Sequence, residues 1–497
     1  MKIILAGHNV DYEVIKECRA ALDGGERLTP ETLCAAYARI SRNPLPVDEL
    51  GKAARGEVEK ARRSNKNIVF GMGHSSIAEH AIFNVDILGV SRLVVEEIEK
   101  FRLCSYTEKS QRYIRLEDDF VVPQEVKDGG LEGLFVETIR EQNHLYHELY
   151  SGLKEYLFEK HWEMLADPSN RSTVDGWAKE DARYIVSMAT HAQLGMTLSA
   201  RNLELMLRRC AAHPLQEVNE YGTQLYGATG DIAPSLVRYT EATPFDRDTK
   251  GALKKLTASL TAHTDVHDEN IVIAEEGNVT LVDATPDGDG KIIASLLHSS
   301  SDLPLETCMA AVRTMAREEK ETVIRTACRH MQAYDPPLRE FENAGFLFEA
   351  VVSASCFAQL KRHRMATITC QEYDPSLGVT IPAGVRAIGM DGPFMEIISQ
   401  TNEAYRRIRE VSPPAAPYIL TNSHRKRVAM RVNVRELYHI SRLREDLHAQ
   451  WDIRETAERM VRMGKNFMPL ALMLTAGKDG FVPISQEERR NNKQGGK

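Results

Sequence analysis

The stretch Gln359-Leu360-Lys361-Arg362-His363-Arg364-Met365-Ala366-Thr367-Ile368-Thr369-Cys370-Gln371-Glu372-Tyr373-Asp374 follows an apolar, helix-like run from Val351 to Phe357. Four cationic or titratable side chains in a row, Lys361 to Arg364, would cost several kcal/mol to bury without partners. We therefore expect them to face either solvent, the usual fate of an isolated charge run, or an anion. A second, altered copy of this stretch in the same chain favours the anion.

The second copy runs from Lys100 to Tyr113 and aligns without a gap at a constant offset of 262 residues. Further matches continue at an offset of 259, where Phe135, Glu137, Asn143 and Tyr146 correspond to Phe394, Glu396, Asn402 and Tyr405. At an offset of 234, Ala182–Val186 and Ala200–Leu203 correspond to Ala416–Leu420 and Val434–Leu437. Matches on steady offsets predict a tandem duplication, and the drop from 259 to 234 places 25 extra residues of the first half around Glu155–Asp175.

The repeat predicts a first half over residues 1–240, a second half over 270–476 and a polar, disordered tail over 477–497. Helical spacing is expected at Thr29–Ser41, Val47–Ser64 and Ser91–Arg102, and alternation predicts a strand at 81–88. Residues 271–297 resemble a short-stranded opening of the second half, with Asp287-Gly288-Asp289-Gly290 as a hairpin turn.

Composition limits the function classes. A chain of 497 residues is too long for one core and predicts two large domains. The net charge of -8 argues against a general nucleic-acid binder. No run is long enough to span a bilayer and the N-terminus lacks a signal peptide, so we expect no membrane partner. Eight scattered cysteines, without a C-x-x-C pair, indicate free thiols in a reducing cytoplasm.

The segment Gly71-Met72-Gly73-His74-Ser75-Ser76-Ile77-Ala78-Glu79-His80 predicts a loosened turn that opens a helix. Backbone N–H groups at such a start favour an anion, although helix capping by serine is the commoner explanation. His74 and His80 have no third ligand nearby in the sequence, so we predict no metal site.

Taken together, these residues resemble flavin-dependent thymidylate synthase. That family carries R-H-R-x-x-S-x-x-x-x-S-x-R-Y, preceded by H-x-S/T-x-x-E-H and followed by A-R-x-x-L-P and N-x-R-x-L. Each half of the chain resembles one whole protomer. The resemblance implies an α/β (α+β) fold of two tandem domains, each a mainly antiparallel sheet packed with helices.

Neither half keeps every motif. The first has Lys100-Phe101 in place of Arg-His and Cys210 in place of a downstream arginine. The second has Asp374 in place of the arginine of R-Y, and Pro417 in place of that of A-R. Because a site in this family lies between protomers, these complementary losses imply one complete hybrid site and one altered site.

The resemblance assigns residues to two ligands. Those implied to bind deoxyuridine monophosphate (dUMP) are Gln359, Arg362, Glu108, Ser110, Arg112, Arg183 and Arg444. Those implied to bind FAD are Ser76, Glu108, Arg362, His363, Arg364, Asn433, Arg435 and His439. Guanidinium groups suit phosphate because they bind it bidentately and stay charged. Arg444 is the predicted catalytic residue, since a fixed cation beside uracil favours ionisation of N3.

The implied reaction is reductive methylation of dUMP to dTMP, with methylenetetrahydrofolate and NADPH as co-substrates, by a homodimer that mimics a tetramer. Two alternatives stay open: flavin-dependent alkylation of another pyrimidine nucleotide, and a catalytically silent flavin- or nucleotide-binding regulatory protein. Single residues also have structural alternatives. Arg201 and Arg435 could form salt bridges, His448 could satisfy the core, and Cys104 and Cys370 are better explained as lining thiols than as nucleophiles.

Overall fold

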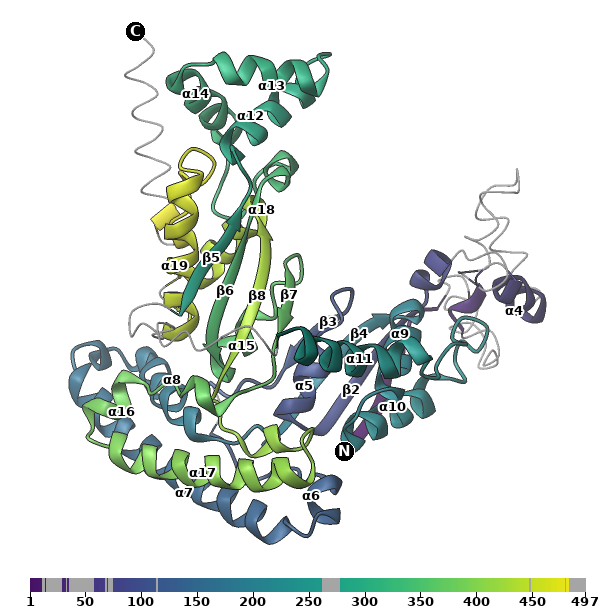
Figure 1. The fold of residues 1–497 in the computed structure, drawn as a ribbon, viewed down its shortest axis with the longest axis vertical. Helices are drawn as coiled ribbons and strands as arrows, with labels where there is room; N and C mark the ends of the chain where they lie inside the picture. The colour runs from purple at the N-terminus through teal and green to yellow at the C-terminus, as the bar shows by residue number, and fades with distance from the viewer. Residues whose placement is uncertain are drawn as a thin grey trace. The chain divides into compact units, whose positions relative to one another are not determined.

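The computed structural model describes residues 1–10, 14, 29–32, 34, 58–67, 69, 75–112, 115–261, 278–446, 448–478 and 480–481. The chain divides into two compact units, which are described separately (Figure 1). Unit 1 comprises Met1–His267 and Gly384–Thr421, and unit 2 comprises Asp268–Ala383 and Asn422–Lys497. A segment of the second half therefore belongs to the unit built mainly from the first half.

Unit 1 contains an antiparallel sheet whose strand order is β1-β2-β4-β3. Its strands are β1 (Lys2–His8), β2 (Ile82–Ser91), β3 (Ser105–Glu108) and β4 (His191–Ser199). Along β2, Phe83, Val85 and Ile87 are buried while Asn84 and Asp86 are exposed. The alternation seen at 81–88 therefore marks a strand with one covered face, as predicted.

Helices and turns complete unit 1, and residues 58–66 and 92–98 confirm parts of the predicted helices. The elements are α4 (Val58–Lys66), η3 (Ser75–His80), α5 (Arg92–Ile98), α6 (Gln124–Asp128), α7 (Glu132–Lys160), η4 (Met164–Ala166), η5 (Pro168–Asn170), α8 (Arg171–Ala182), η6 (Arg183–Ile185), α9 (Ala200–Ala211), α10 (Gln216–Thr229), α11 (Pro244–Thr261), α16 (Ala383–Ala387), α17 (Asp391–Val411) and η9 (Ala416–Ile419). Ser91 begins α5 by accepting a hydrogen bond from the Val94 amide at 3.1 Å.

The extra residues of the first half lie where the offsets predict them. Helix α7 has 29 residues and its counterpart α17 has 21. Helix α8 also has no counterpart, because only residues 412–415 separate α17 from η9.

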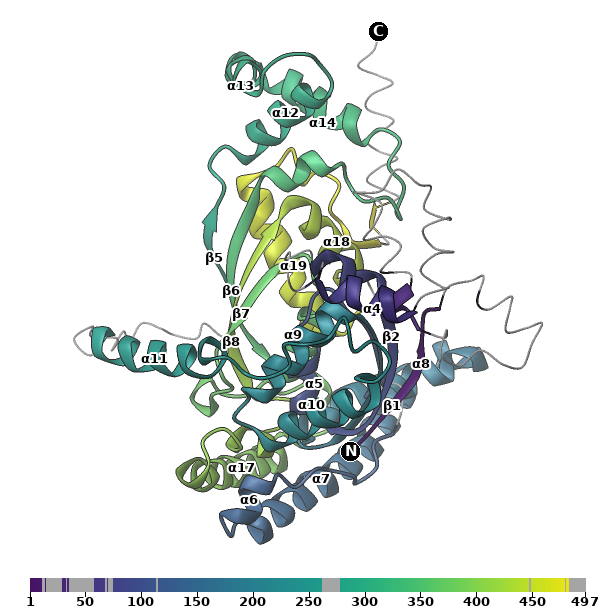
Figure 2. The same ribbon diagram turned by 90° about the vertical axis from the view of Figure 1, so that its right-hand side faces the viewer.

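Helices α7 and α17 lie side by side, and residues at equivalent repeat positions meet there (Figures 1 and 2). The Gln142 side-chain amide donates to Thr401 Oγ1 at 2.8 Å, across the offset of 259, and to the Ile419 carbonyl at 3.0 Å. Ser187 and Thr421, related by the offset of 234, form an antiparallel β-bridge. Contact between equivalent residues is the signature of a two-fold axis, here an approximate one within a single chain.

The ends of the same helix pair obey that symmetry. A Cβ on Gly152 would lie 3.3 Å from Ile388 Cδ1, and a Cβ on Gly129 would lie 2.5 Å from Val411 Cγ1. The offset of 259 converts the first pair into the second, because Gly152 corresponds to Val411 and Gly129 to Ile388. Each end of the interface therefore places a glycine against a branched apolar side chain.

Unit 2 repeats the sheet with strand order β5-β6-β8-β7, again antiparallel. Its strands are β5 (Val279–Ala284), β6 (Gly345–Ser353), β7 (Thr367–Cys370) and β8 (Arg425–Asn433). The helix-like run Val351–Phe357 is half strand: β6 continues to Ser353, whose hydroxyl caps the next helix by accepting from the Cys356 amide at 3.0 Å. Apolar residues alone did not distinguish the buried strand end from the helix start.

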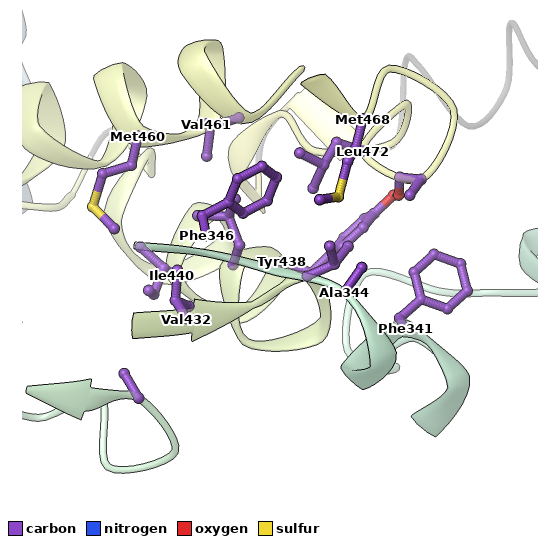
Figure 3. Close-up of a cluster of buried hydrophobic side chains, with 14 of the residues drawn as sticks. Phe341, Ala344, Phe346, Val432, Tyr438, Ile440, Met460, Val461, Met468 and Leu472 are labelled. Carbon is purple, nitrogen blue, oxygen red and sulfur yellow. The ribbon is translucent and has the colours of Figure 1, made fainter. Parts of the chain in front are cut away.

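The remaining described elements of unit 2 are helices and helical turns. They are α12 (Gly288–Ser299), α13 (Leu305–Thr314), α14 (Arg317–Cys328), η7 (Arg339–Asn343), α15 (Ala354–Leu360), η8 (Pro375–Leu377), α18 (Val434–Arg444) and α19 (Trp451–Phe467). Tyr438 of α18, Phe346 of β6 and Met460 of α19 belong to one buried cluster (Figure 3). This cluster fixes α18, and with it Arg435 and His439, two of the residues that the family resemblance assigns to flavin.

The predicted hairpin turn at Asp287–Gly290 is wrong, because helix α12 begins there. Asp287 precedes the helix with a φ of 49°. The Asp289 carboxylate accepts from the amides of Leu470 and Ala471 at 3.1 and 2.8 Å. Asp and Gly are common in hairpin turns and at helix starts alike, and this tertiary contact decides between them.

Several expectations concern residues outside the described ranges. Most of Thr29–Ser41, residues 47–57 and most of the tail at 477–497 belong to this group. The predicted domain bounds stay a prediction, although each sheet lies within one predicted half. Among the described helices, none is both long and apolar enough to cross a membrane.

The pseudo-two-fold contact predicts a stability effect. Gln142→Ala removes the donor for Thr401 and for the Ile419 carbonyl, which then stay buried without it. We expect the free energy of unfolding to fall by about 1–3 kcal/mol in urea titrations followed by circular dichroism. Gln124→Ala, which removes an exposed contact with Asp128 on α6, is the matched control and is expected to change little. Equal effects of the two substitutions would contradict the prediction.

Candidate functional site

In unit 2, the charge run forms a tight turn directly after α15. Gln359 lies in the last turn of α15, and the His363 amide donates to the Leu360 carbonyl at 3.2 Å. This turn buries the His363 side chain, which is 2% exposed, and leaves Arg362 and Arg364 exposed on either side. One motif thus combines a core imidazole with two surface cations.

Arg444, the last residue of α18, reaches back to this turn. Its Nε donates to His363 Nε2 at 3.0 Å, and its Nη2 donates to the Gln359 carbonyl at 3.2 Å. The Gln359 side chain donates to Gln450 Oε1 at 3.4 Å. The structure therefore brings together Gln359, His363 and Arg444 of the predicted site.

Burial and charge keep His363 neutral. Desolvation, with the Arg444 guanidinium as a second cause, lowers the pKa of His363 to about 3. Because Nε2 accepts from Arg444, the ring proton resides on Nδ1. The His439 ring stands edge-on to His363 at 5.8 Å, and burial lowers the pKa of His439 as well.

Two more predicted flavin residues, at the start of α18, have structural contacts. Asn433 caps the helix by accepting from the Glu436 amide at 2.8 Å. Arg435 donates to the Pro337 carbonyl at 2.8 Å and to Glu342 at 3.0 Å, which is the salt-bridge alternative that the sequence left open. Its repeat equivalent Arg201 likewise pairs with Glu79 of η3.

In unit 1, Arg112 is held in the turn after β3. Glu108 ends that strand, and the Arg112 amide donates to Ser110 Oγ at 3.2 Å. The Arg112 Nε donates to Glu180 Oε2 at 2.6 Å, and Glu180 is buried on α8. Helix α8, which has no counterpart in the second half, therefore supplies a carboxylate to Arg112, a residue predicted to bind phosphate.

Arg183 joins the same group. It opens η6 directly after α8 and is 6% exposed. Desolvation lowers the pKa of Arg183, the Glu180 carboxylate opposes that shift, and the charges of Arg112 and Arg92 add to it. Glu180 thus binds one predicted phosphate-binding guanidinium group, that of Arg112, and its charge also acts on the second, that of Arg183. The two arginines and the one glutamate carry a net positive charge, which suits a dianion.

Ser76 lies exposed in η3, which contains Ser75–His80 of the predicted H-x-S/T-x-x-E-H segment. The helix-like expectation for this segment is met by a short 3-10 helix of six residues. His74 and the glycines before it lie outside the described residues.

The residues that depart from the motifs have local contacts of their own. Lys100 pairs with Glu97 at 2.5 Å, and Glu97 also lies 3.5 Å from His213. Cys210 is buried, and desolvation raises the pKa of its thiol to about 12. Asp374 caps η8 by accepting from the Ser376 amide at 2.9 Å. These contacts are those of structural residues.

Sequence reasoning missed two carboxylates that the structure places in these groups. Glu180 contacts Arg112, and Glu436 lies 3.4 Å from His363. Each stands three residues from a predicted site residue on a helix, Glu180 before Arg183 and Glu436 before His439. Residues three apart lie on one face of a helix, so this spacing was the sequence signal that could have identified the two glutamates.

Comparisons with known proteins agree with the repeat. The family described as thymidylate synthase complementing protein matches residues 26–235 and 280–470. A flavin-dependent thymidylate synthase of Clostridium tetani is 27% identical over 42% of the chain and 82% of its own length. A UPF0159 protein of Thermoplasma acidophilum is 24% identical over 93% of the chain and 99% of its own length. A Helicobacter pylori flavin-dependent thymidylate synthase solved with FAD and dUMP shows 15% identity at a TM-score of 0.30, covering 48% of the chain and all of that structure, too weak a likeness to support an argument.

The low pKa of His363 predicts a pH dependence of stability. In the unfolded chain His363 binds a proton near pH 6.5, whereas in the folded chain it stays neutral down to about pH 3. Falling pH therefore costs stability, by up to about 1.4 kcal/mol per pH unit below pH 6.5. Urea titrations at pH 7, 6 and 5 are expected to show a steeper loss for the wild type than for His363→Phe. The exposed-site control His144→Phe is expected to keep the wild-type slope, and parallel curves for all three proteins would contradict the assignment.

Proposed function

Because the chain belongs to the thymidylate synthase complementing protein family, we propose that it is an FAD-dependent thymidylate synthase. It methylates dUMP to dTMP, with methylenetetrahydrofolate as the one-carbon donor and NADPH as the reductant. The similarity to relatives named flavin-dependent thymidylate synthase supports this reaction. The substrates and co-substrates are part of the proposal.

The observation that carries the proposal is that the two halves retain different residues of the motif set. Unit 1 contains Arg112, which binds Glu180, and the buried Arg183, and unit 2 contains Arg444, which binds His363. Each group is the part of the motif set that the other half has lost. We propose that the two groups act on one substrate molecule as a hybrid site, while the copy marked by Lys100, Phe101, Cys210 and Asp374 is inactive.

Each residue is assigned to the part of dUMP that its side-chain chemistry suits. Arg112, Arg183 and Arg362, with Ser110, bind the phosphate, because guanidinium forks match its oxygens and remain charged. Gln359 and Glu108 contact the sugar or base through donor and acceptor atoms. Arg444 stabilises the uracil ring as an anion at N3, and the neutral His363 holds the guanidinium without adding a second charge.

The residues present also fit a flavin dinucleotide. The exposed guanidinium groups of Arg362 and Arg364 suit its diphosphate, and His439 and Ser76 supply exposed polar side chains. Asn433 and Arg435 would support the cofactor from positions that their structural contacts already fix. When bound, FAD supplies the hydride and carries the one-carbon unit, so no protein nucleophile is required.

We further propose a cytoplasmic homodimer in which the duplicated chain imitates a tetramer of single repeats. The approximate two-fold contact between α7 and α17 supports a pairing of unlike halves. The free thiols of the described cysteines, six of the seven buried, are compatible with a reducing compartment.

A catalytically silent flavin- or nucleotide-binding protein is the second candidate. One observation favours it: the UPF0159 relatives match over 83% and 93% of the chain, and their names state no activity. Yellow colour in the purified protein would identify a flavoprotein in either case. Turnover of dUMP, or of another pyrimidine nucleotide, separates the enzyme from the silent protein.

Three substitutions test the hybrid site. Arg112→Ala and Arg444→Ala each remove charge-assisted contacts of about 1.5–3 kcal/mol, so kcat/KM for dUMP is expected to fall by about 10- to 150-fold or more. Asp374→Asn keeps the cap of η8 and is expected to retain wild-type activity. Steady-state assays of dTMP formation provide the comparison. Equal losses from all three would show that the active and altered sites are wrongly assigned.

Growth provides the test in cells. The gene alone is expected to rescue a bacterium that requires thymidine, and the Arg183→Ala variant, expressed to the same level, is expected to fail. Rescue by both proteins would exclude the proposed phosphate site, and rescue by neither would favour the silent protein.

A further inference from the structure

His363 has two ring nitrogens in different surroundings. Nε2 accepts from Arg444 Nε at 3.0 Å, which requires the proton to be on Nδ1. Nδ1 is buried and has no hydrogen bond to any residue that the structure describes. A buried donor of this kind needs an acceptor, because desolvation of an unpaired polar group is unfavourable.

The Glu436 carboxylate lies close to this nitrogen. Glu436 Oε1 lies 3.4 Å from His363 Nδ1, and both side chains are less than 8% exposed. A carboxylate rotation that shortens this distance by a few tenths of an ångström would give a normal hydrogen bond. His439 and Arg435, the titratable neighbours on α18, are directed elsewhere, the former edge-on to the His363 ring and the latter toward Pro337 and Glu342.

Glu436 also occupies a position from which a side chain can cap the start of α18. Asn433-x-x-Glu436 has the spacing of a capping box, in which the glutamate side chain would bind the Asn433 amide. Only half of that motif forms: Asn433 Oδ1 accepts from the Glu436 amide, whereas the Glu436 carboxylate faces His363. The glutamate side chain is therefore not used to start the helix.

The other repeat provides an internal comparison. The positions of His363, Glu436 and Arg444 are occupied in the first half by Phe101, Asn202 and Cys210. Asn202 donates there to Ser199 Oγ at 2.9 Å, a local contact at the helix start. All three members of the group are thus present together in one repeat and absent together from the other, as expected for side chains that act as a unit.

We propose that Glu436 is a positioning residue: it holds the Nδ1 proton of His363, so that Nε2 remains the acceptor that orients the Arg444 guanidinium. The order of contacts is Glu436 carboxylate, His363 imidazole, Arg444 guanidinium, pyrimidine. Only the last contact, between Arg444 and the pyrimidine, rests on the proposed function. The contacts of Glu436 with His363 and of His363 with Arg444 do not depend on any reaction.

Solid-state nitrogen-15 NMR of the full chain labelled at histidine tests the tautomer directly. The His363 signals are assigned by their loss in His363→Phe. At pH 7 we expect a neutral ring with a protonated Nδ1 and an unprotonated Nε2. Glu436→Ala is expected to move protonation toward Nε2, whereas Glu436→Gln keeps the wild-type pattern because its amide oxygen also accepts. Glu342→Ala, which breaks a different contact to α18, is the matched control and is expected to leave the pattern unchanged.

Kinetics provide the second readout. Glu436→Ala is expected to lower kcat for dTMP formation by about tenfold, since misorientation of a transition-state contact affects kcat more than KM, and Glu436→Gln is expected to restore it. The proposal is overturned if His363 carries its proton on Nε2 in the wild type, or if Glu436→Ala leaves the tautomer unchanged. If the wild type shows the expected tautomer and lacks turnover, the proposed function fails while the Glu436–His363 contact stands.

Discussion

The contact between α7 and α17 is the constraint from which the rest of the architecture follows. Equivalent residues meet across it, Gln142 with Thr401 and Ser187 with Thr421. An interface of this kind normally joins two identical chains. Here both surfaces belong to one chain, so the pairing always joins one copy of each repeat. Identical subunits share one sequence, so that sequence must keep every residue of the site. Two unlike repeats that always pair can each lose a different subset of the site residues.

The two groups of proposed site residues differ in how their charges are arranged. In unit 1, the buried Glu180 carboxylate accepts from Arg112, and its charge offsets part of the effect that Arg112 has on the buried Arg183. In unit 2, a single arginine is oriented by an imidazole that burial keeps neutral. The first arrangement accumulates positive charge and suits a phosphate. The second fixes the direction of one charge, which suits a ring where charge develops during reaction.

The sequence predicted the features that repeat or alternate. Equivalent offsets located the duplication, and the strand at 81–88 followed from alternation. The roles of the arginines come from the family resemblance and stay a prediction. Local sequence patterns gave wrong secondary structure where a contact with a residue far away in the sequence determines it. Asp287–Gly290 begins a helix because Asp289 binds the amides of residues 470 and 471, and Val351–Ser353 is strand because β6 extends into the apolar run. Glu180 and Glu436 escaped notice for a similar reason, since their partners lie 68 and 73 residues away in the sequence.

The proposed function requires one working nucleotide site that uses residues of both halves. Equilibrium dialysis of labelled dUMP against the purified, flavin-loaded protein measures this most directly, as moles bound per mole of chain. One dUMP per chain is the predicted result, with binding lost on substitution of either Arg183 or Arg362 by alanine. Two equivalent sites per chain, or one site that survives both substitutions, would contradict the account.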